Sequence, residues 1–130
     1  MFGFSALFGR SREVRRLDDA LRAAGLHPNL VPDAVKIASL KFLKEAGYGH
    51  IPAPEACADT AGMLAYCMLG DHGFGVENGT ARARALKTRL EAALDAGDSF
   101  DARLVLLTLH AGLTQNALAD RYQLQASTTP

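Results

Sequence analysis

Apolar residues in this chain recur at intervals of three and four, and glycine or proline separates the segments in which they do so. The first such segment follows Ser11, a residue that can cap a helix, and its apolar residues are Val14, Leu17, Leu21 and Ala24. This period places the four side chains on one face of an α-helix. Gly25 and Leu26 come next, an order typical of a Schellman turn. Because strand-like alternation is almost absent, the pattern predicts an all-α fold.

The same pattern predicts four further helices, over residues 32–46, 54–69, 80–96 and 100–112. Pro32 suits the first position of the earliest of these, and Gly47 ends it. Gly97 and Ser99 supply a C-terminal glycine and an N-cap, so the last two helices should pack as an antiparallel hairpin. We therefore expect a compact single-domain bundle of five main helices, with a short sixth at the C-terminus as an addition.

At 130 residues the chain has the length of one domain. We expect residues 1–125 to form it, with 1–10 as an apolar N-terminal segment and 126–130 as a flexible tail. The opening MFGFSALF is too short to span a membrane, and its arginines follow it, the reverse of a secretory signal. A helix would hold Cys57 and Cys67 too far apart for a disulfide, and free thiols favour a cytoplasmic location without membrane insertion.

The balance of charge argues against a polyanion as partner. Fourteen Lys and Arg residues match fourteen Asp and Glu residues, whereas nucleic-acid-binding domains need a basic excess to replace phosphate counterions. We therefore expect nucleic acid not to be a partner.

The C-terminal stretch nevertheless resembles the start of a helix-turn-helix of the phage-repressor type, in which Thr-Gln precedes Leu-Ala and apolar residues close the turn. The matching residues are Thr114, Gln115, Leu118, Ala119, Tyr122 and Leu124. Gln123 stands where that family usually has a turn glycine, and the recognition helix would begin near Ala126. The resemblance thus stops before the element that reads bases, and no family resemblance extends over the whole chain.

The densest group of glycines lies in CMLGDHGFGVENG, residues 67–79. We interpret this stretch as a connector between the helices predicted over 54–69 and 80–96. Its glycines can turn backbone N–H groups toward an anion, and the start of the next helix adds a positive dipole end and arginines. The candidate anion-binding residues are Gly73, Gly75, Gly79, Thr80, Arg82 and Arg84. The glycine order matches neither GxGxxG nor the Walker pattern, so it does not indicate a nucleotide fold.

Catalytic and metal-binding interpretations have less support. Asp71 and His72 are half of a triad to which Cys67 would supply the nucleophile, but adjacent loop residues rarely point at one another. Glu55 and Asp59 share one helix face, yet the Glu-x-x-His or second acidic pair of metal-binding bundles is missing. We therefore assign no catalytic residue, metal ligand or cofactor and expect the protein not to be an enzyme.

Self-association remains after these exclusions. Ile37 and Leu40 fall among the lysines of the second predicted helix, which indicates either a partner-facing surface or a second packing layer. The apolar N-terminal segment offers three more interface candidates, Phe2, Phe4 and Phe8. We expect a small helical interaction or regulatory protein that forms homo-oligomers such as a homodimer. Binding of phosphate or another small molecule at the glycine-rich stretch is the alternative, ahead of a metal-dependent or Cys/His enzyme and a helix-turn-helix-like DNA binder.

Overall fold

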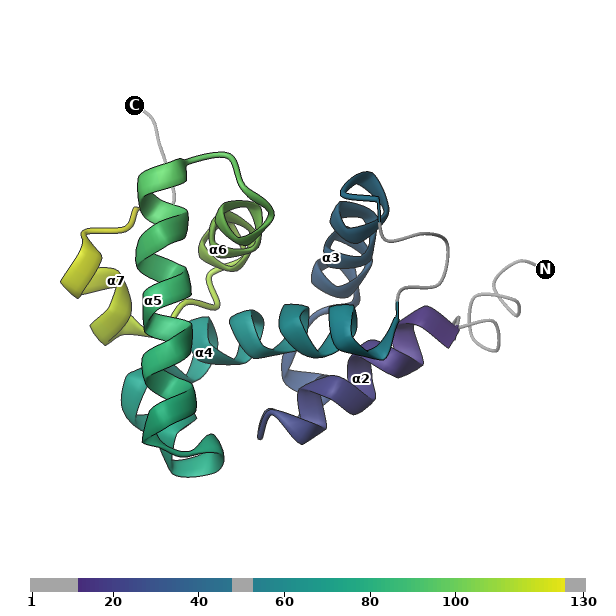
Figure 1. Cartoon of the computed structure of the whole chain (residues 1–130), viewed down its shortest axis with the longest axis horizontal. Helices are drawn as coiled ribbons and strands as arrows, with labels where there is room; N and C mark the ends of the chain where they lie inside the picture. The colour runs from purple at the N-terminus through teal and green to yellow at the C-terminus, as the bar shows by residue number, and fades with distance from the viewer. Residues whose placement is uncertain (1–11, 48–52, 126–130) are drawn as a thin grey trace.

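The computed structural model describes residues 12–47 and 53–125, and every regular element in these ranges is helical (Figure 1). The helices are α2 (Arg12–Ala23), the 3-10 turn η1 (Pro28–Leu30), α3 (Asp33–Glu45), α4 (Pro54–Asn78), α5 (Thr80–Ala96), α6 (Phe100–His110) and α7 (Asn116–Tyr122). The all-α expectation is confirmed for the described part of the chain. The predictions for Ser11, the N-terminal segment and the C-terminal tail fall outside it.

Helix α4 is the centre of the fold. Figure 1 shows it crossing the middle of the molecule, and it contacts α2, α5, α6 and α7. Its middle turns are buried on every side, as a helix of small and apolar residues should be when neighbours surround it. The fully buried residues there include Ala61, Met63, Leu64 and Ala65.

The chain forms its helix ends as the sequence predicts in two places. After α2 the Leu26 N–H donates to the Leu21 carbonyl and the Gly25 N–H to the Arg22 carbonyl, each at 3.0 Å. With Gly25 at φ 86°, this is the Schellman arrangement. Before α6 the Ser99 hydroxyl accepts a hydrogen bond from the N–H of the third helical residue at 3.1 Å, so the predicted N-cap is present.

Helix α4 breaks at Gly70, where φ is 81° and ψ is 176°. Essentially only glycine adopts this backbone region. Beyond the break, residues 71–78 form further helical turns instead of the connector that the glycines suggest. Phe74 explains the difference, because it is fully buried and meets the ring of Tyr66 edge-on at a centroid distance of 5.7 Å. Burying this large apolar side chain offsets the low helix propensity of the neighbouring glycines.

Helix α7 packs against this break. The Gln115 N–H donates to the Cys67 carbonyl at 2.8 Å, and a break at Gly70 is what leaves that carbonyl free of its usual partner four residues later. The Gln115 side chain then caps α7 by accepting a hydrogen bond from the Leu118 N–H at 3.2 Å. The kink in α4 and the docking of α7 are therefore one feature.

The buried face of α3 differs from the expected one. Leu40 is only 3% exposed and belongs to the core, which agrees with the packing layer that the sequence left open and not with the interface position. Lys36, one helical turn earlier, is also buried, and its ammonium group lies 2.8 Å from a carboxylate oxygen of Asp18 on α2. Because this ion pair makes burial of a lysine tolerable, α3 can turn Leu40 inward. Ile37 remains on the surface, 59% exposed.

Candidate functional site

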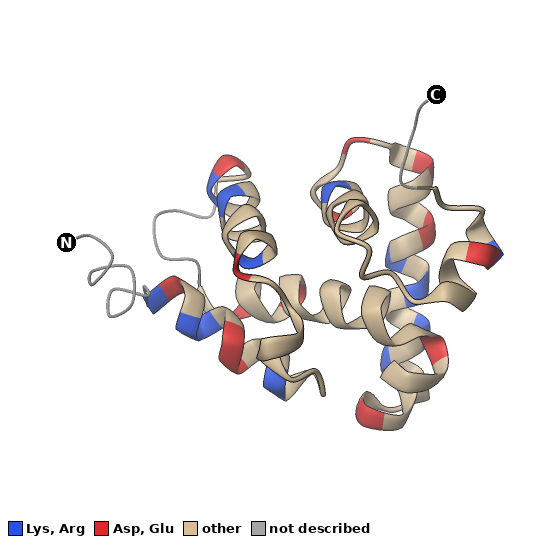
Figure 2. Cartoon of the chain, turned by 180° about the vertical axis from the view of Figure 1, so that it is seen from behind, with Lys and Arg blue, Asp and Glu red and all other residues tan. Residues whose placement is uncertain are grey.

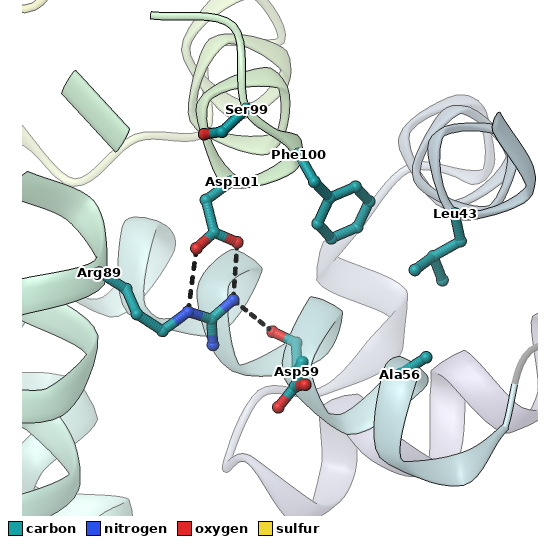
Figure 3. Close-up of a pocket in the computed structure, with 7 residues that line it drawn as sticks. All are labelled: Leu43, Ala56, Asp59, Arg89, Ser99, Phe100 and Asp101. Atoms are coloured by element: carbon teal, nitrogen blue, oxygen red, sulfur yellow. Dashed lines mark hydrogen bonds and ion pairs between the residues drawn. The ribbon is translucent and has the colours of Figure 1, made fainter. Parts of the chain in front are cut away.

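A cavity of about 380 Å³ lies where α3, α4, α5 and α6 meet (Figure 3). Its lining residues are Leu43, Ala56, Asp59, Arg89, Ser99, Phe100 and Asp101. Close to the cavity, Arg103 of α6 bridges to α3, with a nitrogen 2.9 Å from Glu45 and its guanidinium 4.2 Å above the Phe42 ring. This cavity could not be predicted from the sequence, because its lining residues come from four separate helices.

Arg89 is hydrogen-bonded to two other residues that line the cavity. Its Nε and Nη2 donate to the two carboxylate oxygens of Asp101 at 3.1 and 2.7 Å, and Nη2 also reaches the Asp59 carbonyl at 3.3 Å (Figure 3). Burial acts to lower the pKa of Arg89, but the hydrogen bonds and charge of Asp101 outweigh it and raise the pKa overall. The guanidinium therefore stays charged and ties α5 to α6 and α4. The geometry is that of a structural ion pair beside a cavity.

The candidate anion-binding residues are arranged differently from the predicted loop. Gly73 and Gly75 lie inside the second part of α4, and the Gly79 N–H donates back to the Gly75 carbonyl at 2.7 Å. The structure does place Thr80, Arg82 and Arg84 together at the start of α5, where no side chain caps the helix. All three residues are exposed. Arg82 leans toward α4, its Nη2 lying 3.4 Å from where a Cβ on Gly62 would be. The first turn of α5 is what remains of the predicted site.

The charged residues of α5 follow one another in the order that its helix dipole disfavours. The first half carries Arg82, Arg84, Lys87 and Arg89, and the second half carries Glu91 and Asp95. Figure 2 shows blue segments along the earlier part of this helix and red ones at its end. A helix dipole favours the opposite order, with acidic residues first and basic residues last. The charge order therefore does not stabilise α5 through its dipole.

An apolar groove of about 150 Å³ lies between α5 and α6. Leu94, 38% exposed, and Leu106, 47% exposed, line it together with Leu124. Its remaining lining residues are Ala93, Gly97, Ala102, Val105 and Leu109. The sequence pattern assigns both exposed leucines to the core, because it cannot show that α6 has neighbours on only some of its sides. Of the predicted interface residues, Ile37 is exposed, whereas Phe2, Phe4 and Phe8 lie outside the described residues.

The Asp71 carboxylate joins α4 to α7. The Tyr66 hydroxyl donates to one of its oxygens, and Arg121 Nη1 lies 2.5 Å from the other. Burial, followed by the bond to Asp71, raises the pKa of Tyr66, so its phenol stays protonated. Burial raises the pKa of Cys67 to about 12, while His72 is exposed. Asp71 thus orients a tyrosine and an arginine, and the described contacts do not form the half-triad considered from the sequence.

Helix α7 is the part of the helix-turn-helix resemblance that the structure describes. Gln123, at the position of the family's turn glycine, has φ 55° and ψ 44°, the left-handed conformation that a glycine would take there. The segment that would hold the recognition helix begins near Ala126, outside the described residues.

Within residues 12–47 and 53–125, no three His, Cys, Asp or Glu side chains are grouped so that they could hold a metal ion. None of the helices in these ranges has the length and apolar character needed to cross a membrane. Comparisons with protein-family models, with curated proteins and with solved structures give no match. A function therefore has to be argued from the surfaces and cavities themselves.

Proposed function

We propose that this chain is a small helical interaction protein, and not an enzyme, that acts by associating with a second copy of itself. The observation that carries the proposal is the open groove between α5 and α6. Single exposed leucines are ordinary on protein surfaces, but Leu94 and Leu106 line one hollow with other apolar residues. A second copy that covers this hollow removes both leucines from water, which favours association.

The use of the charged side chains supports a non-enzymatic role. Arg89 is held by Asp101, and Lys36 by Asp18, in pairs that join one helix to another. Catalytic sites instead tend to present a perturbed acid, base or nucleophile to a cleft. Cys57 and Cys67 are buried free thiols, which supports the reducing, cytoplasmic location that we propose for the protein.

Sedimentation velocity over a range of about 1–500 μM tests the proposal, because small apolar interfaces usually give micromolar or weaker affinity. We expect the mass to rise with concentration and Leu94→Asp/Leu106→Asp to reduce that rise. Val76→Asp is the matched control, since Val76 is 69% exposed on α4 and lies outside the groove. A wild-type mass that stays monomeric throughout would refute the proposal.

Anion binding at the start of α5 is the second candidate. The first turn has no side-chain cap, and the exposed Arg82 and Arg84 add positive charge where a helix already favours an anion. A thermal-shift series with inorganic phosphate, pyrophosphate and nucleotides should then stabilise the wild type and not Arg82→Ala/Arg84→Ala. Arg12→Ala/Arg15→Ala, which alters two exposed arginines of α2, is the control and should respond like the wild type. If no anion stabilises the wild type, this candidate is excluded.

A further inference from the structure

We propose that the second copy binds along the outer face of α5 in antiparallel orientation, so that Arg84 of each α5 lies beside the acidic residues Glu91 and Asp95 of the other. This inference rests on the proposed self-association but assigns it to a face of α5 that lies about 120° around the helix from Leu94. The face and the apolar groove are therefore two different surfaces of the same helix.

The outer face of α5 is exposed in the described structure, and Tyr122 of α7 reaches it through a hydrogen bond to Glu91. At about 100° per residue, seven residues fall within about 60° of the direction of Thr88. They are Ala81, Arg84, Ala85, Thr88, Glu91, Ala92 and Asp95, and all are exposed. The opposite face carries the buried residues of the helix, Ala83, Leu86, Leu90 and Ala93. The 17-residue helix therefore presents to solvent one face of three alanines, one threonine and three charged residues.

The charges on this face can be neutralised by another α5. Arg84 and Asp95 have no ion pair with any described residue, and Glu91 accepts a hydrogen bond of 2.6 Å from the Tyr122 hydroxyl. If two antiparallel copies cross near Thr88, Arg84 of one copy lies level with Ala92 of the other, between Glu91 and Asp95. Two-fold symmetry repeats that attraction at the other end of the crossing. A parallel arrangement would instead place like charges together.

The charge order also explains why the pairing is specific to a second copy. Basic residues at the start of α5 and acidic residues at its end oppose the helix dipole, as noted above. In the antiparallel pair, the charged residues of this face, Arg84, Glu91 and Asp95, lie beside opposite charges from the partner. The three alanines on the face leave room for the helices to approach, and residues 81, 85, 88, 92 and 95 have the alternating four- and three-residue spacing of a helix-pair seam.

Charge reversal tests the arrangement by sedimentation velocity. Arg84→Glu and Asp95→Arg should each weaken association roughly tenfold, because two-fold symmetry counts each exposed pair twice. The double variant Arg84→Glu/Asp95→Arg should recover part of the wild-type association, because it exchanges the signs of these two positions and leaves Glu91 unchanged. Lys41→Glu on α3, a reversal of one exposed charge outside this face, is the control and should leave association unchanged.

Cross-linking gives an independent result that does not depend on electrostatics. Thr88→Cys lies near the proposed two-fold axis, so oxidised glutathione should convert it to a disulfide-linked dimer, whereas Val76→Cys should stay largely monomeric. The native Cys57 and Cys67 do not compete, because both are buried.

The outcomes separate this inference from the proposed function. If the wild type associates, but charge reversal has no effect and Thr88→Cys does not cross-link, the α5 pairing is wrong and self-association stands. Loss of association in Ile37→Asp alone would then assign the interface to α3. If the wild type is monomeric at every concentration, both proposals fail and the α5 face belongs to a different partner or to solvent.

Discussion

Substituting Gly70 by alanine tests the kink on which the placement of α7 depends. At φ 81° and ψ 176°, an alanine pays backbone strain of about 1–3 kcal/mol. Its Cβ would also lie 2.9 Å from Oε1 and 3.0 Å from Cδ of Gln115. Moving that side chain loses its hydrogen bond to the Leu118 N–H, a cap whose loss costs about 0.5–2 kcal/mol. We therefore expect Gly70→Ala to lower the free energy of unfolding by about 2–4 kcal/mol.

Urea denaturation followed by circular dichroism measures this loss, and Gln115→Ala separates its two parts. In the Gln115→Ala background the Gly70→Ala substitution should retain the backbone strain and lose the steric conflict, so its effect should be smaller. Gly75→Ala is the matched control, because Gly75 lies inside the helix and an added Cβ would make only an ordinary contact of 3.7 Å with Ala83. It should be neutral or stabilising by up to about 1 kcal/mol.

Either of two results would contradict this explanation of the kink in α4. A Gly70→Ala protein within about 0.5 kcal/mol of the wild type would show that α4 does not need this break. A strongly destabilised Gly75→Ala protein would show that residues 71–78 are not helical.

Three further predictions concern stability and reactivity. Arg89→Ala should reduce stability by about 1–3 kcal/mol in thermal unfolding, because it leaves the partly buried Asp101 carboxylate without its cation, and an unchanged midpoint would contradict this. Burial acts to raise the pKa of Asp71, but two hydrogen bonds outweigh it and hold the pKa below its ordinary value, so its stabilisation is present above about pH 4 and is lost on further acidification. The stability advantage of the wild type over Asp71→Asn, measured by urea denaturation from pH 7 to pH 2, should therefore shrink below about pH 4, and a constant difference would contradict the assignment. The buried Cys57 and Cys67 should react with Ellman's reagent only upon unfolding, and fast labelling of the native protein would show that they are accessible.

The period of apolar residues predicts the helices well where each helix packs against its neighbours along one face. Helix α5 begins at Thr80 and ends at Ala96 as expected, and its buried Leu86 and Leu90 are spaced four residues apart, as the period of apolar residues requires. The Schellman ending at Gly25 is likewise visible in the sequence, because it depends on residues within one turn of each other. Local chemistry of this kind needs no knowledge of the tertiary structure.

Features that depend on a distant residue could not be predicted in this way. Lys36 is buried because Asp18 on another helix neutralises it, and only this contact decides between the packing layer and the interface that the sequence left open for Leu40. The glycines of residues 71–78 look like a connector, although burial of Phe74 holds them in a helix. The spacing of Tyr66, Phe74 and Asn78 at multiples of four is the one signal that could have indicated this segment. The cavity beside Arg89 has no sequence signature, since four helices contribute to it.

Sedimentation equilibrium of the wild type and its charge variants tests whether this chain binds a second copy of itself along α5. We expect the mass of the wild type to rise with concentration from the monomer value of 13.8 kDa toward twice that value. We also expect weaker association in Arg84→Glu and partial recovery in Arg84→Glu/Asp95→Arg. A mass fixed at the monomer value, or a double variant no better than the single one, would contradict binding along α5.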